Sequence, residues 1–353
     1  MSLKDKETLG SFITKILNGT ATAIVVALIP NAILATFLKP LLPNALASDF
    51  LHIVQVFQFF TPIMAGILIG QQFKLTPMQQ LAVGGAAYIG SGAWVFAQAS
   101  FGGAAAIGIF QLKGIGDLIN TMITAGVAVL AIRMFGHKFG SLNIILLPIL
   151  IGTGIGYVGW LLLPYVSYIT KFIGDIINSF TVLQPILMSI LISMSFAILI
   201  VSPISTVAIG LAVGLNGLSA GAASMGIAAT TAVLVWATIK NNKAGVPIAI
   251  GLGAMKMMMP NFLKNPIIGV PMLITAAISS LTVPLFNLVG TPATSGFGLV
   301  GLVGPIASLQ GGCGILMMLI TWIVVPFAVG FAVHKLCKDV LKLYDDEKFI
   351  FKG

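Results

Sequence analysis

The sequence predicts an all-α polytopic membrane protein with about ten transmembrane helices in two inverted five-helix repeats. Composition predicts the class, since 58% of the 353 residues are hydrophobic and 8% are charged, against roughly 25% charged residues in a soluble domain. A repeated phrase predicts the duplication: SFITKIL at 11–17 returns as SYITKFI at 167–173. A membrane protein built from two such copies commonly binds its solute between them, so transport is the first hypothesis.

Ten apolar stretches are long enough to cross a bilayer, which takes about 20 residues. They lie at 20–43, 51–71, 78–97, 114–135, 143–163, 184–203, 220–239, 246–263, 267–289 and 313–334. Three Gly-rich apolar stretches between them, at 99–112, 204–219 and 291–312, are too short or too broken to cross. We predict re-entrant or unwound segments there, because irregular backbone at membrane depth is tolerated only when it is buried in protein or lines a wet cavity.

The two copies divide the chain into a first repeat at 1–163, a second repeat at 164–335 and a charged cytoplasmic tail at 336–353. Each repeat opens with an amphipathic helix on the membrane surface, the first within 1–20 and its twin at 166–180. Five crossings per repeat, an odd number, place the copies in opposite orientations. With both termini cytoplasmic, twelve Lys and Arg residues lie inside and five outside, which agrees with the positive-inside rule.

The ionisable residues argue against several classes of function. The nine acidic residues lie at segment ends, at surfaces or in the tail, apart from Asp117 near the start of a segment, and a proton or sodium relay usually needs such groups inside the membrane. Cys313 and Cys337 do not have the spacing of metal ligands, and no cofactor fingerprint or catalytic motif is present. Scattered basic residues argue against nucleic-acid binding. We therefore predict no metal, no cofactor and no catalytic residues.

Neutral hydrogen-bonding side chains collect where the predicted helices are broken. The stretches SPIST at 202–206 and TPATSGFG at 291–298 free backbone donors and acceptors, which hydroxyl and amide side chains either satisfy or present to a ligand. Uncharged groups of this kind suit a neutral, polyhydroxylated solute. The predicted solute-binding residues are Ser202, Ser205, Thr206, Asn216, Thr294 and Ser295, with Gln98 and Ser100 near a pseudo-symmetric hairpin. Because Ser, Thr and Gly also pack membrane helices closely, a structural role stays open.

A second group of polar residues lies on the first two predicted crossings. His52, Gln55 and Gln58 recur at every third position, and Asn31 follows a proline in the middle of the first crossing. The spacing keeps the first three on one side of a helix. We predict that these four residues line a pathway, with hydrogen bonding to neighbouring helices as the alternative role.

Two of these stretches carry a resemblance to a known family. SPISTVAI at 202–209 and GLSAGAA at 217–223 resemble the membrane-embedded EIIC family of the bacterial sugar phosphotransferase system, in the branch of perfringolysin-regulator-like membrane proteins. The stretches at 77–87 and 295–305 are similar to that branch as well. The resemblance extends over roughly 10–335.

The resemblance implies a homodimeric transporter of the bacterial inner membrane that moves a small polar solute, a sugar in the first instance, by alternating access. Soluble EIIB and EIIA proteins would be its partners. Phosphotransfer would require a separate EIIB, because the sequence offers no recognisable phosphorylatable His or Cys of its own. Two other functions stay open: a membrane-bound ligand sensor or regulator without phosphotransfer, and a facilitator for an organic anion outside the phosphotransferase system.

Overall fold

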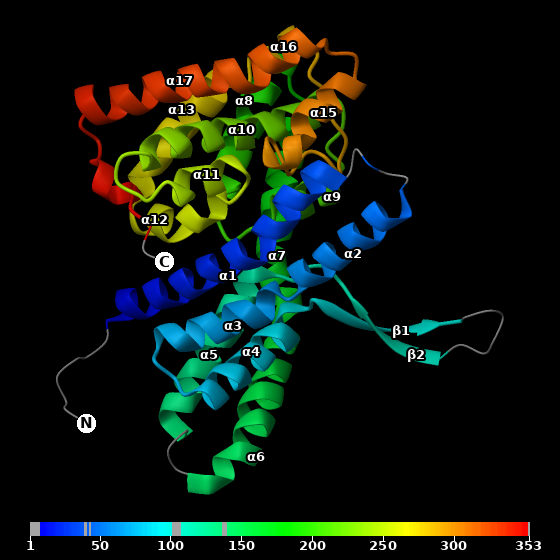
Figure 1. The fold of residues 1–353 in the computed structure, drawn as a ribbon, viewed down its shortest axis with the longest axis vertical. Coiled ribbons are helices and arrows are strands. Elements are labelled where there is room, and N and C mark those ends of the chain that lie inside the picture. Colours follow the sequence, from blue (N-terminus) through cyan, green and yellow to red (C-terminus); the bar gives the residue numbers. More distant parts are fainter. Residues whose placement is uncertain (1–7, 39–40, 42–43, 101–106, 136–139, 352–353) are drawn as a thin grey trace. The chain divides into compact units, whose positions relative to one another are not determined.

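The computed structural model describes residues 8–38, 41, 44–100, 107–135 and 140–351 (Figure 1). These residues are mostly helical and fall into two compact units. Unit 1 comprises Met1–Asn31 and Ala45–Ser167, and unit 2 comprises Ala32–Asn44 and Tyr168–Gly353. Seven helical stretches of the described residues are long and apolar enough to cross a membrane. This agrees with a helical membrane protein, whereas the ten crossings and their inverted orientation stay predictions.

Unit 1 consists of helices and one β-hairpin. Its elements are α1 (Leu9–Leu38) and α7 (Gly156–Phe180), which both continue into unit 2, with α2 (Ala45–Phe59), α3 (Thr61–Gln72), α4 (Pro77–Ser91), β1 (Trp94–Ala99), β2 (Ile107–Leu112), α5 (Leu118–Phe135) and α6 (Asn143–Leu147). Helix α4 shows how the sequence sets such boundaries. Thr76 and Gln79 form a capping box at its start, and Gly92, with a φ of 68°, ends it.

One buried amide ties three helices of unit 1 together. Asn120 on α5 is fully buried, and its Nδ2 donates hydrogen bonds to the carbonyls of Gly90 on α4 (2.6 Å) and Gly159 on α7 (2.7 Å). A Cβ added to either glycine would strike Thr124, so the backbones approach α5 closely at these two points. The Asn120 amide therefore fixes the crossing of α4, α5 and α7.

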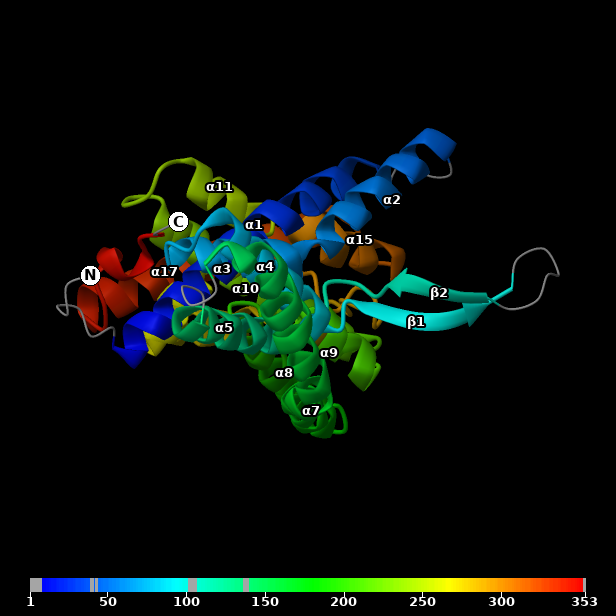
Figure 2. The same ribbon diagram turned by 90° about the horizontal axis from the view of Figure 1, so that it is seen from below.

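In the segment predicted as re-entrant or unwound at 99–112, the described residues 99 and 107–112 belong to a β-hairpin and are therefore not unwound. Strands β1 and β2 pair antiparallel, from Trp94 opposite Leu112 to Ala99 opposite Ile107, and form a twisted ribbon (Figure 2). Aromatic and β-branched residues favour strands, and the ladder gives the backbone groups of both strands their partners. The crossing predicted at 78–97 is wrong at its end for the same reason, because α4 stops at Ser91.

Unit 2 is built around one central helix, α10. The elements of the unit are α8 (Pro185–Leu199), α9 (Thr206–Val213), α10 (Leu218–Thr238), α11 (Gly245–Gly251), α12 (Met259–Lys264), α13 (Gly269–Ser279), α14 (Thr282–Leu285), α15 (Val303–Gln310), α16 (Ile315–Leu319) and α17 (Val325–Lys335). Helix α10 packs against α8, α13 and α17 and is almost entirely buried. A Cβ added to Gly226 would meet the Ser193 carbonyl on α8, so small residues allow this close packing.

The crossing predicted at 246–263 is also wrong. The chain there forms three short helices: α11, a 3-10 turn at Met255–Met258, and α12. Gly253 lies between the first two with a φ of 125°, a conformation that glycine adopts readily and other residues avoid. The stretches predicted as unwound at 204–219 and 291–312 combine turns with the short helices α9 and α15.

The two amphipathic surface helices are not separate elements in the structure. Residues 9–20 begin the continuous helix α1, and residues 166–180 end the continuous helix α7; residues 1–7 lie outside the described part. Pro164, at the predicted border between crossing and surface helix, is accommodated inside α7.

The two units share an order of helix packing. In unit 1, α4 packs against α3, α5 and the π-helical turn before α7, as α10 packs against α8, α13 and α17 in unit 2. Short sequence matches follow the same order. PIMAGILIG at 62–70 pairs with PILMSILIS at 185–193, MITAGVAVL at 122–130 with LITAAISSL at 273–281, and WLLLPY at 160–165 with WIVVPF at 322–327.

This order differs from the register of the repeated heptapeptide. Helix α2 lies between the heptapeptide at 11–17 and α3, whereas α8 follows the copy at 167–173 almost directly. One gapless duplication cannot produce both matches. The helix matches rest on packing as well as sequence, so we take them as the better register for comparing the two units.

Candidate functional site

Four connecting segments of unit 2 meet at one place, which we call the helix-break cluster: residues 202–206, 216–217, 253–256 and 290–296. Three of the four hold residues predicted from the sequence to bind solute. Hydrogen bonds between segments far apart in the chain hold the cluster together. The structure therefore brings the two broken stretches of the sequence into contact.

The break between α8 and α9 is shaped by two serines. Ser202, after the end of α8, is buried; its Oγ donates to the carbonyl of Leu199 (2.8 Å) and accepts from the N–H of Ile204 (3.2 Å). Ser205 caps α9, because its Oγ accepts from the N–H of Ala208 (3.2 Å). Both hydroxyls serve their own backbone, as expected where a helix stops and restarts.

The start of α9 rests directly on the stretch at 290–296. Buried Thr206 donates its hydroxyl to the carbonyl of Gly296 (2.8 Å). A Cβ added to Gly296 would lie 2.5 Å from the backbone N and Cα of Val207. A Cβ added to Gly210, one turn along α9, would strike the Oγ of buried Ser295. Only glycines allow the two segments to approach this closely.

A backbone pair joins the start of α10 to the same stretch. The N–H of Gly217 donates to the carbonyl of Gly290 (2.9 Å), and the N–H of Gly290 donates back (3.0 Å). Next to this pair, Asn216 is exposed, and its Oδ1 accepts from the N–H of Gly217 (2.9 Å). Its Nδ2 has no hydrogen-bond partner among the described residues. This amide is thus available to a ligand.

Thr294 is used mainly by the turn that contains it. Its hydroxyl accepts from the N–H of Thr291 (2.8 Å) and donates to the carbonyl of Thr291 (3.0 Å). Its carbonyl accepts from the hydroxyl of Ser224 on α10 (3.0 Å). The residue therefore shapes the loop, and a ligand that bound its hydroxyl would replace one of these bonds.

Sequence reasoning missed Lys256 as a member of the cluster. Its Nζ donates to the carbonyls of Ser202 (2.6 Å) and Ile204 (2.7 Å), across the break between α8 and α9. The residue is 8% exposed and lies outside the seven stretches long enough to cross a membrane. A charged residue alone in the apolar run AMKMMMP was the available signal, because an ionisable group in such a run marks a candidate functional site.

The remaining predicted residues belong to unit 1 or its border. Gln98 is exposed on β1, opposite Gly108 of β2, and Ser100 is exposed just after β1. On α2, His52 is exposed, while Gln55 and Gln58 are half-buried. On α1, the buried Oδ1 of Asn31 has no hydrogen-bond partner in the described part of the chain. The helix-break cluster is built by unit 2 alone.

The cluster consists of connections that differ between the two units. The α3–α4 connection is 73–76, whereas the matching α8–α10 connection is 200–217 and contains α9. The β-hairpin joins α4 to α5, whereas α11, α12 and Lys256 lie between α10 and α13. The connection after α13, at 280–314, supplies the stretch at 290–296. Unit 2 thus carries the cluster on a helix arrangement that both units share.

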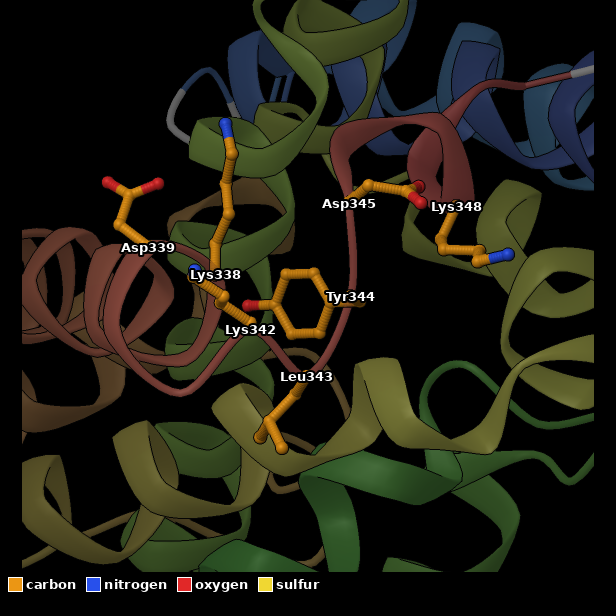
Figure 3. Close-up of a pocket in the computed structure, with 7 residues that line it drawn as sticks. All are labelled: Lys338, Asp339, Lys342, Leu343, Tyr344, Asp345 and Lys348. Carbon is orange, nitrogen blue, oxygen red and sulfur yellow. The ribbon is translucent and has the colours of Figure 1, made fainter.

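A separate pocket of about 440 Å³ lies at the C-terminal segment of unit 2 (Figure 3). Its lining residues are Lys338, Asp339, Lys342, Leu343, Tyr344, Asp345 and Lys348. Lys338 also forms an ion pair with Asp346. Three ammonium groups and two carboxylates give the pocket mixed charge, and it shares no residue with the helix-break cluster.

Two asparagine amides strap the chain's C-terminal segment, residues 346–351, to unit 2. Asn261 on α12 donates to the carbonyls of Lys348 (2.8 Å) and Ile350 (2.9 Å). Asn242, beyond α10, donates to the carbonyl of Phe349 (2.9 Å) and accepts from the N–H of Phe351 (2.8 Å). The strap therefore also holds α12 in place, and α12 directly follows the turn that carries Lys256.

Replacing Asn261 with alanine is expected to release the strap. Two hydrogen bonds are lost, and net contributions of roughly 0.5–1.5 kcal/mol each should speed amide exchange of 346–351 by about 5- to 160-fold. Hydrogen-exchange mass spectrometry measures this directly. Asn265→Ala is the matched control, since the Asn265 amide reaches only the carbonyl of Asn261 (3.3 Å). Unchanged exchange in the Asn261 variant would contradict the strap.

Comparison with known proteins adds one finding. A model of the family described as "Phosphotransferase system, EIIC" matches residues 14–351, nearly the whole chain. No curated protein and no solved structure is found to match. The match includes both units and every segment of the helix-break cluster. The chain therefore belongs to the EIIC family of the phosphotransferase system.

Proposed function

We propose that the protein is the membrane transporter component of a phosphotransferase system and that the helix-break cluster is its solute site. The family supports a transporter component. The cluster is supported by its geometry: helix ends that free backbone groups, glycines that allow close approach, and an exposed Asn216 whose Nδ2 has no hydrogen-bond partner among the described residues. Discontinuous helices are where secondary transporters hold their solutes.

The solute is a small polar molecule, with a sugar as the first candidate. Backbone carbonyls and amides offer directed hydrogen bonds of the kind that hydroxyl groups accept and donate. Separate EIIB and EIIA proteins are the proposed partners, and EIIB would supply the phosphoryl group. A homodimer in the bacterial inner membrane, with the tail in the cytoplasm, completes this proposal, which rests on the family.

We further propose that the two units derive from one duplicated module. The shared packing order and the three matched sequence segments support this. After duplication, unit 1 kept short connections or a β-hairpin, whereas the connections of unit 2 acquired the solute site. The predicted inverted orientation of the two copies remains part of the proposal.

Replacing Asn216 with leucine is expected to abolish solute binding while the fold is kept, because Asn216 is exposed and its side chain accepts only the N–H of Gly217. A bound solute at about a hundredfold excess over its dissociation constant stabilises the folded state by about 2.7 kcal/mol. Thermal unfolding of the purified protein with glucose, fructose, sorbitol and gluconate measures this gain. Asn241→Leu, another exposed asparagine, is the control.

One result would count against the site and another against transport. Equal stabilisation of the Asn216 variant and wild type by the same solute would move the site away from the cluster. A solute that binds wild type, but whose uptake into proteoliposomes does not occur with or without phosphorylated EIIB, would favour a sensor over a transporter.

A further inference from the structure

Lys256 is a buried lysine in a part of the molecule with few other charged residues. The elements packed against its turn are α10, α11 and α12, and its hydrogen-bond partners lie in the break between α8 and α9. Of all these segments, only α12 carries another ionisable side chain, the exposed Lys264. The described acids of unit 2 are Asp175 on α7 and four residues after α17: Asp339, Asp345, Asp346 and Glu347.

No carboxylate is within ion-pair distance of Lys256 in the described part of the chain. A buried charge is normally paired, because its removal from water costs several kcal/mol. The two carbonyl oxygens that accept from Lys256 are neutral. They orient the side chain but do not neutralise its charge. In its charged form, Lys256 therefore has no counter-ion among the described residues.

The ammonium form of Lys256 has one N–H donor more than the two carbonyls accept. An ammonium has three N–H donors, and the carbonyls of Ser202 and Ile204 take two of them. A neutral amine, with two N–H groups, would satisfy the same carbonyls. Burial lowers the pKa of Lys256 to about 7, so the side chain gains or loses its proton close to physiological pH.

We propose that Lys256 binds an anionic oxygen of the transported solute, a carboxylate or a phosphate, through its third N–H. This rests on the proposed solute site and assigns the solute to the anionic polar molecules, such as sugar acids or sugar phosphates. The bound anion supplies the missing half of the ion pair. It also stabilises the ammonium form, so binding above neutral pH takes up a proton from solvent.

Isothermal titration of the detergent-purified protein with gluconate, glucose 6-phosphate and glucose tests this. At a pH one unit above the pKa of Lys256, titration in two buffers of different ionisation enthalpy reports proton uptake. At least one of the two anions should bind more tightly than glucose and take up close to one proton per site.

Two variants separate binding from structure. Lys256→Gln keeps N–H donors for the two carbonyls but lacks the charge, and should bind the anion roughly 10- to 100-fold more weakly, as expected for loss of a hydrogen bond to a charged group. Lys256→Arg keeps a permanent charge, so it should bind the anion without proton uptake. Thermal unfolding of both variants confirms that they are folded before titration.

The outcomes distinguish this inference from the proposed function. Tight binding of glucose that is equal in wild type and Lys256→Gln would overturn the role of Lys256 and leave the solute site standing. Anion binding without proton uptake, or unaffected by Lys256→Gln, would overturn it as well. If none of the three probes bound, the anionic assignment would fail; if Asn216→Leu also left binding of every solute in its own panel unchanged, the proposed site would fail separately.

Discussion

Replacing Asn120 with aspartate is expected to destabilise the protein by about 3–5 kcal/mol, the cost of an uncompensated buried charge. The change is nearly isosteric. It replaces the amide nitrogen that donates to the carbonyls of Gly90 and Gly159 with an oxygen that faces the same two acceptors. The Oδ1 of Asn120 already lacks a partner in the described structure, so no donor is available to the new carboxylate.

The measurement is the thermal unfolding midpoint of the detergent-purified protein, followed by tryptophan fluorescence. Asn178→Asp makes the same chemical change at an exposed position of α7 and is expected to alter stability by less than about 0.5 kcal/mol. The destabilisation should lessen at low pH, where the carboxyl group is protonated and regains a donor. If both variants unfolded at the wild-type midpoint, Asn120 would not tie α4, α5 and α7 together.

Replacing Gly296 with alanine is expected to disrupt the helix-break cluster. The new Cβ would lie 2.5 Å from the backbone of Val207, and a backbone cannot move aside as a flexible side chain can. Overpacking of this kind costs about 1–3 kcal/mol. The start of α9 must shift from 290–296, which breaks the bond from the Thr206 hydroxyl to the Gly296 carbonyl. Solute binding should fall by at least about tenfold, equivalent to 1.4 kcal/mol.

Gly85→Ala is the matched control for this change. Gly85 lies in α4, and a Cβ added there meets nothing within 4 Å. Alanine favours a helix over glycine by roughly 0.5–1 kcal/mol, so this variant should be as stable as wild type or slightly more so. Thermal unfolding and the solute titrations described above measure both effects. A Gly296 variant with wild-type stability and binding would show that the cluster tolerates separation of its two stretches.

The sequence predicted the broken stretches because they depend on local chemistry. Pro203, the serines around it and the repeated glycines at 290–298 all disfavour the interior of a helix. From the sequence, both stretches were assigned to one solute site, but no contact between them was identified. Their contact depends on a shape match between Gly296 and Val207. These residues are 89 positions apart, and a single sequence carries no pattern that predicts such a match.

Lys256 was missed because the methionines around it indicated a segment that fills the core, not a functional site. Four methionines surround it, and methionine usually fills irregular gaps in a core. A helix over 246–263 was a sound prediction from hydropathy, and a lysine in a crossing would have required a partner. The structure breaks that helix at Gly253, and the freed turn carries the ammonium to the end of α8.

The β-hairpin was missed because strand signals are short and a membrane-like composition favours helices. WVFAQA and IGIFQL each offer only six residues, and such runs occur in buried helices as well. Pairing decides between the two structures, since a strand gains its hydrogen bonds only from a partner strand. That partner is separated from β1 by residues outside the described part of the chain.

The sequence by itself determined that this is a helical membrane protein of the EIIC family, because hydrophobic composition and family resemblance survive any rearrangement of the helices. It also predicted the interruptions at 202–206 and 291–298, through Pro, Gly and capping residues. Only the tertiary structure decided which interruptions meet, which hydroxyls are used by their own backbone, and that a lysine bridges the break between α8 and α9. Those features arise from contacts between distant segments, whose energies depend on distances that no local pattern encodes.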